Sequence, residues 1–260
     1  DDLDHPRMPK YKCYLFPNLF RVTPATVAML RRTVLRDGNL AIFGPGTGVT
    51  NGKHLNAKGA SAILGLEMEL LPRPTARRVM LQDHGHPISK RLPTMTFGDQ
   101  HAFGPTLVPK TFPLPKDSGA TLLGETFYHY FLDRAGLLVR EVGRGARTAT
   151  GEARGPDDYA VVFAPAVPLP PELLRECARH AGAHVWSEEN AVVYASETFV
   201  SLHTVRSGPQ RISLPWPARV RPLADPTAPA SEPTQIIDLD VKAPATVSYW
   251  LERIDHEPKP

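Results

Sequence analysis

The sequence contains little cysteine and no long apolar run, and each absence excludes a class of protein. Only Cys13 and Cys177 occur among the 260 residues. Two thiols cannot build a disulfide-rich scaffold or a zinc site made of cysteines alone. No stretch approaches the roughly 20 apolar residues that a membrane-spanning helix needs. We therefore expect no membrane association.

A strong excess of charge and a secretion leader are also missing. The net charge of +3 comes from 30 basic and 27 acidic residues. No basic run or alternating aromatic and basic pattern accompanies it, so we expect no nucleic-acid partner. The chain begins with an acidic segment, residues 1–4, where a secretion signal would be positively charged. This favours a cytoplasmic location over export, and the missing initial Met suggests that the chain is part of a larger protein.

Proline, by contrast, is abundant. The chain has 28 prolines, about twice the average share of ~5%. Each proline fixes one φ angle and removes one backbone donor, which disfavours long helices. The composition therefore predicts short elements joined by stiff loops rather than a helical bundle.

The N-terminal pattern predicts a strand, a helix and a second strand. Tyr11–Phe16 is short, aromatic and closed by a proline, as in a buried strand. Thr23 followed by Pro24 is a helix start, and Asp37-Gly38 is a helix stop. Leu40–Phe43 reads as the next strand. Such a βαβ unit predicts a parallel sheet.

The rest of the chain suggests two domains. Tyr159–Phe163 and Pro171–Ala181 again read as a strand followed by a helix. Beyond residue 205 the prolines persist, the helical period disappears and short strand patterns remain. We predict an α/β domain over residues 1–204 and a small antiparallel β module over residues 205–260.

A glycine-rich loop, Gly44–Gly48, follows the second predicted strand. It matches neither the phosphate-binding P-loop nor the dinucleotide fingerprint, because the lysine-serine pair and the following helix are missing. Ligands of open α/β sheets nevertheless bind beyond the carboxyl ends of the strands. The residues that we expect at this edge, and predict as ligand-binding candidates, are Asn18, Gly46, Thr47, Asp83 and His84.

No set of catalytic residues emerges from the motifs. Cys13 lies in a predicted strand and Cys177 on the apolar face of a predicted helix, which is typical of buried thiols rather than nucleophiles. Glu188-Glu189 reads as a surface turn, and Glu125 and Glu141 lie on alternating strands that face solvent or a partner. Glycoside chemistry needs two carboxylates across a sugar cleft, and we find no such pair.

The densest group of possible metal ligands is Asp83-His84-Gly85-His86. Two histidines and one aspartate could hold a metal ion, but no third ligand is fixed by the spacing. Histidines in a polar loop are also compatible with simple hydrogen bonding or solvation. We expect no metal and no cofactor.

Three segments resemble family forty-two β-galactosidases. Tyr11–Phe20 (YKCYLFPNLF), followed by Thr23 and a helix, resembles the opening of the middle domain of these enzymes. Leu169–Trp186 resembles a second motif of that domain, and Asn190–Ala195 with Phe199–His203 resembles a third. These segments cover both ends of the predicted α/β domain and little of its middle.

The resemblance implies a fold. The family's middle domain is a flavodoxin-like, three-layer α/β trimerisation domain related to class I glutamine amidotransferases, and a small β-sandwich follows it. In this chain the sandwich would span Arg206–His256. The resemblance also implies a homo-oligomer, specifically a trimer.

The resemblance implies, too, that catalysis lies elsewhere. The family's acid/base and nucleophile stand on an N-terminal barrel, the former within an Asn-Glu dipeptide, and this sequence contains no Asn-Glu. The implied function is the non-catalytic scaffold and oligomerisation portion of a β-galactosidase-like glycoside hydrolase. Its partners would be a missing catalytic barrel and the parent enzyme's carbohydrate substrate.

Two alternatives stay open. The chain could be a stand-alone small-ligand binder or hydrolase that uses the crevice at the carboxyl ends of the parallel strands. It could also bind sugar through its β module, with Trp216 and Trp250 stacking on the carbohydrate. Whether the chain is itself an enzyme is therefore left undecided at this point.

Overall fold

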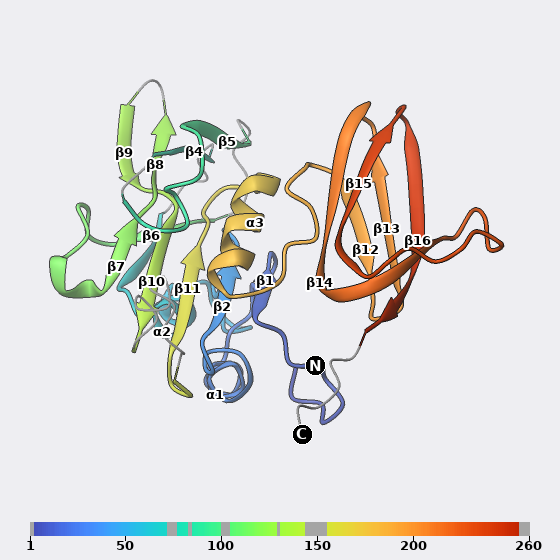
Figure 1. The fold of residues 1–260 in the computed structure, drawn as a ribbon. Helices are drawn as coiled ribbons and strands as arrows, with labels where there is room; N and C mark the ends of the chain where they lie inside the picture. Colours follow the sequence, from blue (N-terminus) through green and yellow to red (C-terminus); the bar gives the residue numbers. More distant parts are fainter. Residues whose placement is uncertain are drawn as a thin grey trace. The chain divides into compact units, whose positions relative to one another are not determined.

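The computed structural model describes residues 3–71, 77–82, 85–99, 105–128, 131–143 and 155–254. Figure 1 shows the chain from its N-terminal to its C-terminal end. It divides into two compact units between Ala183 and His184. None of the helices in the described part is long and apolar enough to span a bilayer.

A five-stranded mixed sheet forms the centre of the first unit. Its strand order is β1-β2-β11-β10-β7. Strands β1, β2 and β11 are parallel, whereas β10 is antiparallel to both of its neighbours. The five strands are β1 (Cys13–Phe16), β2 (Asn39–Phe43), β11 (Tyr159–Phe163), β10 (Leu138–Val142) and β7 (Ala120–Leu122).

The predicted βαβ unit is confirmed. Helix α1 (Pro24–Thr33) joins β1 to the parallel strand β2. Thr23 caps it through a reciprocal hydrogen-bond pair with Thr26, and Pro24 occupies the first turn, where a missing N–H costs little. Asp37, with a φ of 55°, lies in the turn that leads into β2. The start and stop signals in the sequence therefore describe this element correctly.

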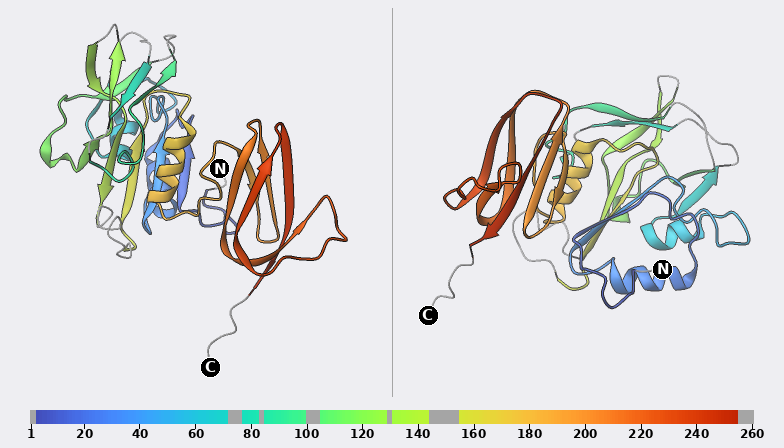
Figure 2. Two further views of the ribbon diagram at one scale, coloured as in Figure 1. Left: turned by 45° about the horizontal axis from the view of Figure 1, so that its top comes forward. Right: turned by 90° about the vertical axis from the view of Figure 1, so that its right-hand side faces the viewer.

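Helices cover both faces of the parallel strands. Residues of α1 and of α2 (Lys58–Leu64) pack with Ala41 and Phe43 on one face. Residues of α3 (Pro171–His180) pack with Leu40 and Ile42 on the other. The alternation follows from the period of two along a strand. Figure 2 shows α3 on the opposite side of the sheet from α1 and α2.

The middle of the first unit is built from antiparallel strands. One sheet pairs β3 (Met68–Leu71) with β6 (Thr106–Pro109). The other has the order β5-β4-β8-β9. Its strands are β4 (Arg77–Leu81), β5 (Met95–Asp99), β8 (Gly124–Tyr128) and β9 (Phe131–Ala135). A short 3₁₀ helix, η1 (Lys116–Ser118), precedes β7.

The predicted flavodoxin-like, three-layer α/β class is therefore wrong. The described residues form three α-helices and sixteen strands in four sheets. A doubly wound domain repeats the βα unit throughout, but here the described residues between 68 and 142 form strands and one 3₁₀ turn and no α-helix. The proline-rich, aperiodic middle explains the difference, because such a sequence disfavours crossover helices and leaves antiparallel pairing as the outcome.

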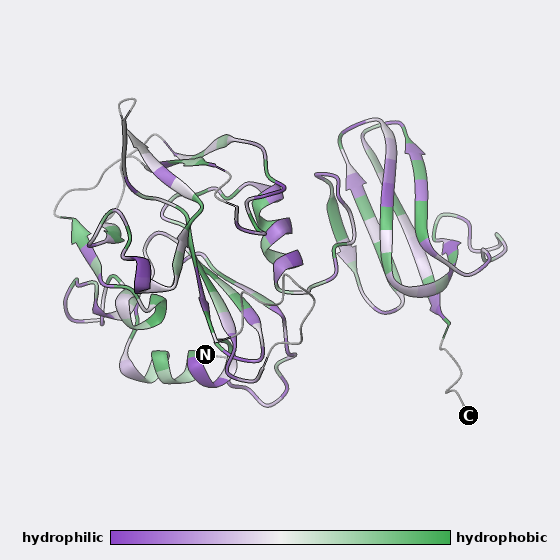
Figure 3. Ribbon diagram, turned by 60° about the vertical axis from the view of Figure 1, so that its left-hand side comes forward, coloured by the Kyte–Doolittle hydropathy of each residue, from purple (hydrophilic) through white to green (hydrophobic). Residues whose placement is uncertain are grey.

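The second unit contains one five-stranded antiparallel sheet with the order β12-β13-β16-β14-β15. The strands are β12 (Val192–Ala195), β13 (Phe199–Thr204), β14 (Gly208–Pro222), β15 (Thr234–Val241) and β16 (Ala245–Arg253). The long strand β14 pairs with β15 in its first half and β16 in its second, with an irregularity between Ser213 and Ala218. Figure 3 shows alternating hydrophobic and hydrophilic bands along these strands, as expected for a sheet that buries one face.

The division between the units falls earlier in the chain than the boundary at residues 204 and 205 that we inferred from composition. Strands β12 and β13 pair with each other and with β16, so they belong to the second unit. The buried residues of this unit include Val200, Leu202 and Leu251. The domain boundary at residues 204 and 205 stays a prediction from composition, whereas this division follows the pairing of the strands.

Candidate functional site

A crevice lies beyond the carboxyl ends of the parallel strands, where we expected one. It has a volume of about 470 Å³, and Asn18 after β1 and Gly46 after β2 both line it. The other lining residues are Pro17, Phe20, Pro45, Val49, Leu55, Pro105, Thr106, Leu107, Pro165 and Val167. Of the described residues around it, none carries a charge. The crevice is therefore suited to an apolar group rather than a phosphate.

The glycine-rich loop beside this crevice is explained by packing. A Cβ atom on Gly44 would lie 2.4 Å from the carbonyl oxygen of Pro17, and one on Gly48 would lie 2.3 Å from the backbone nitrogen of Ala60. The N–H groups of Thr47 and Gly48 donate to carbonyl oxygens of the same unit. These two N–H groups are thus not directed at a ligand and cannot contribute to a phosphate cradle.

Of the other predicted site residues, Thr47 is not among those that line the crevice. Thr47 is fully buried, and its Oγ1 has no hydrogen-bond partner in the described part of the chain. Asp83 and His84 lie outside the described residues. Ligand binding by these five residues stays a prediction.

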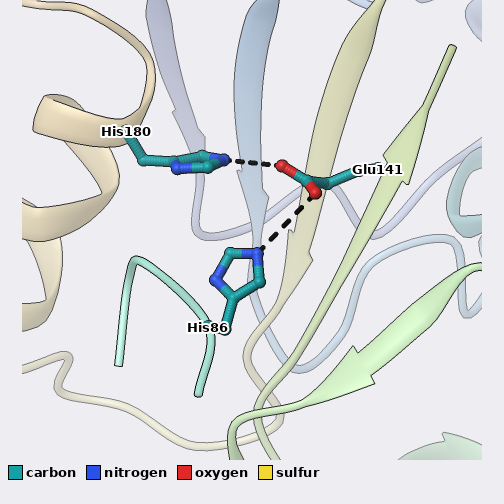
Figure 4. A group of neighbouring side chains, drawn as sticks. All are labelled: His86, Glu141 and His180. Carbon is teal, nitrogen blue, oxygen red and sulfur yellow. Dashed lines mark hydrogen bonds and ion pairs between the residues drawn. The ribbon is translucent and has the colours of Figure 1, made fainter. Parts of the chain in front are cut away.

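A second cluster joins three segments that are far apart in the sequence. His86 precedes the turn at residues 87–91, Glu141 lies on β10 and His180 lies in the last turn of α3. His180 donates from Nε2 to Oε1 of Glu141 over 2.7 Å, and Nε2 of His86 lies 3.8 Å from Oε2. Figure 4 shows both imidazole rings pointing at the one carboxylate.

The register of β10 explains why Glu141 is inside. Val139 belongs to the core beneath α3, and Glu141, two residues later, points to the same face of the strand. The exposed fractions of the three side chains are 7% for His86, 14% for Glu141 and 4% for His180. The prediction that Glu141 faces solvent or a partner is therefore wrong.

Burial and hydrogen bonding act on the Glu141 carboxyl in opposite directions. Burial raises its pKa, but the hydrogen bond from His180 and the electrostatic effect of the two adjacent imidazoles outweigh this and lower the pKa from 4.5 to about 2. The Ile88 N–H donates to Nδ1 of His86 over 3.2 Å. The other ring nitrogen, Nε2, is buried without a hydrogen-bond partner in the described residues.

The cluster borders a cavity of about 490 Å³, which His180 lines. The other lining residues are Gly85, Pro87, Lys90, Arg91, Glu176 and Arg179. Three of these side chains are basic. Because His180 lines this cavity, a small molecule or ion can reach the edge of the cluster through it.

The sequence pointed to His86 as a possible metal ligand but not to Glu141 or His180. It singled out His86 but could not supply a third ligand, because Glu141 and His180 are 55 and 94 residues further along the chain (141 − 86 and 180 − 86). A signal existed: Glu141 follows Val139 at the strand period, so burial of one predicts burial of the other.

The two cysteines behave as the sequence predicted. Both pack in the core on the α3 face of the central sheet. Burial raises the pKa of Cys13 from 9.0 to about 11 and raises that of Cys177 as well. Neither is therefore a thiolate near neutral pH.

Trp216 and Trp250 do not form a joint sugar platform. Trp216 packs against the core of the second unit. Its ring is edge to face with that of Trp186, and the two ring centroids are 6.3 Å apart. Its Nε1 is buried. Trp250 is half exposed on β16 and contacts Phe199. Only one of the two rings is thus available to a sugar.

The chain was also compared with known proteins. No family model and no curated protein sequence matches it. Solved structures do match. A β-galactosidase from Bacillus circulans sp. alkalophilus aligns with a TM-score of 0.54 at 11% identity, over 93% of this chain and 33% of the enzyme.

Two further β-galactosidases give the same result. A catalytic mutant of a GH42 β-galactosidase from G. stearothermophilus aligns with a TM-score of 0.54 at 14% identity, over 94% of this chain and 32% of the enzyme. The β-galactosidase from Rahnella sp. R3 aligns with a TM-score of 0.51 at 10% identity, over 92% of this chain and 32% of the enzyme. This chain thus shares its fold with about a third of each of these β-galactosidases.

Proposed function

We propose that this chain is the non-catalytic scaffold portion of a β-galactosidase-like glycoside hydrolase. The observation that supports this proposal most is the coverage: 93% of the chain aligns with only 33% of a β-galactosidase. On this proposal the remaining part of the enzyme, a catalytic barrel, supplies the chemistry and contacts the carbohydrate.

The chemistry of the described residues agrees with the proposal. A glycosidase needs one carboxyl group as an acid and a second as a nucleophile or base, facing each other across a sugar. The described residues that line the crevice at the strand ends include no carboxylate. Glu141 is enclosed by two histidines and has its pKa lowered, which is the opposite of what a general acid needs.

A scaffold must offer surfaces to other parts of the assembly, and the β1 side of the first unit carries candidates. Strand β1 is at the edge of its sheet, and an edge strand has unpaired backbone groups that another chain can use. Leu15 on this strand is half exposed, and Phe20 and Leu55 are exposed at the rim of the apolar crevice. We assign the contact between copies, a trimer by resemblance, to this rim.

Sedimentation velocity of the whole chain tests this assignment. We expect wild type to sediment as an oligomer whose mass depends on concentration. Leu55→Lys places a charge at a leucine that is 65% exposed at the crevice rim, and should dissociate the oligomer. Val205→Lys, at a valine of the second unit that is 74% exposed, is the matched control and should leave the mass unchanged.

One outcome would contradict self-association, and another would contradict the assignment to the crevice rim. A wild-type chain that stays monomeric at every concentration would contradict self-association. Dissociation by Val205→Lys but not by Leu55→Lys would move the contact to the second unit and remove the role of the crevice rim.

The crevice also supports a second candidate function, the binding of a small apolar ligand. Its volume of about 470 Å³ lies within the range of ligand sites, and its lining is almost wholly apolar. Saturable one-to-one binding of an apolar fluorescent probe by a monomeric chain, weakened by Leu55→Lys, would favour this function over the scaffold.

A further inference from the structure

We propose that His86, Glu141 and His180 form a binding site for a divalent transition-metal ion, with two imidazoles and one carboxylate as its protein ligands. The site would join β10, the end of α3 and the segment that begins at residue 85. Imidazole and carboxylate together are the ligand types of many zinc sites. This inference is independent of the proposed scaffold function.

The geometry places three ligand atoms around one point. One nitrogen of each histidine and one carboxylate oxygen all lie within 4.8 Å of one another. Two ligand atoms that bind a tetrahedral ion at ~2.0–2.1 Å lie about 3.3 Å apart. The distances of 2.7 Å from His180 and 3.8 Å from His86 to the carboxylate bracket this value. Small side-chain rotations would therefore complete the site.

A second, independent observation is the state of His86. Its side chain is 93% buried, that is 100% less the 7% exposed, and Nε2 points at Glu141 without a hydrogen-bond partner in the described part of the chain. A buried polar atom without a partner is costly. A metal ion between His86 and Glu141 would satisfy it, whereas the carboxylate alone, at 3.8 Å, is too far for a hydrogen bond.

Metal binding changes the hydrogen bonding of His86. Its Nδ1 accepts the Ile88 N–H, so the proton of the neutral ring is on Nε2. When Nε2 binds a metal ion, that proton leaves Nε2 and is released or moves to Nδ1. In the latter case the 3.2 Å contact with Ile88 is lost. Histidine sites in general release protons on metal binding.

The cavity beside His180 supplies an entry path and an open coordination position. Three protein ligands leave at least one position of a zinc ion for another ligand. Lys90, Arg91 and Arg179 line this cavity. Glu176 also lines it and pairs with Arg179. The remaining positive charge of Lys90 and Arg91 favours water or a small anion, rather than a second cation, as the remaining ligand.

The site can be tested with Zn²⁺ alone on the full chain, purified without a histidine tag and freed of metal. We expect saturable binding of one ion and an increase in the thermal midpoint, because an ion that binds only the folded state stabilises it. His86→Gln and Glu141→Gln should each weaken binding by more than the roughly 10–100-fold that the loss of an outer partner costs. His54→Gln, in an exposed loop of the same unit, is the matched control and should bind as wild type does.

A spectroscopic measurement on wild type keeps the test valid if a variant fails to fold. X-ray absorption of the zinc-loaded chain should show nitrogen and oxygen ligands only, with the scattering pattern of two imidazoles. A sulfur ligand would assign the ion to Cys13 or Cys177 instead and overturn the proposal. The absence of saturable binding, or equal loss of binding in His54→Gln, would overturn it as well.

Discussion

At the residue scale, buried titratable groups determine how the first unit responds to pH. Cys13 on β1 and Cys177 on α3 belong to the same core, and burial raises the pKa of both thiols. A thiol whose pKa is raised on folding favours the folded state only while it stays protonated. Both cysteines therefore link stability to alkaline pH.

We predict that the free energy of unfolding falls as the pH rises from 9.0 to about 11. The unfolded chain releases the Cys13 proton near the ordinary value of 9.0, whereas the folded chain retains it until about 11. The stabilisation is thus complete below 9.0 and is lost across this interval. Urea unfolding across this pH range measures it, and Cys13→Ala should show a shallower decline. An equal slope in wild type and Cys13→Ala would contradict the assignment.

At the element scale, the loop after β2 depends on close packing of backbone on backbone. Gly48 has a φ of +67°, and a Cβ there would lie 2.3 Å from the backbone nitrogen of Ala60 in α2. Gly119, which ends the 3₁₀ helix η1, also has a φ of +67°, but the atom nearest to a Cβ there, the carbonyl oxygen of Glu141, would lie 3.8 Å away. The two glycines share the unfavourable φ and differ in crowding.

Gly48→Ala should therefore destabilise the protein more than Gly119→Ala does. A positive φ costs an alanine about 1–2 kcal/mol, and both variants share this cost. Gly48→Ala must in addition move α2 away from the loop. Urea unfolding of both variants measures the difference. An equal decrease in the free energy of unfolding would show that α2 moves away from the loop without destabilising the protein.

The elements that the sequence predicted are those with local signals. Thr23 and Pro24 mark the start of α1, and the apolar run Tyr159–Phe163 is strand β11. The antiparallel sheets of residues 68–142 could not be predicted, because pairings such as β4 with β8 depend on contacts between distant segments. The cluster of His86, Glu141 and His180 was missed for the same reason.

At the scale of the whole molecule, the chain consists of two compact units that align together with one third of β-galactosidases. The resemblance of the sequence to these enzymes agrees with this similarity of fold, although the expected flavodoxin-like architecture was wrong. Motif residues such as Leu169–Trp186 hold local structure that many folds can share. The arrangement of four sheets depends on the residues between the motifs.

We propose that the groups that cleave the glycosidic bond are not on this chain. Hydrolysis of a nitrophenyl β-galactoside by the purified chain tests it most directly, with Glu141→Gln and Glu188→Gln as variants that each remove one carboxylate. We expect no hydrolysis above the buffer rate for wild type. Sustained turnover by wild type that either variant abolishes would contradict it.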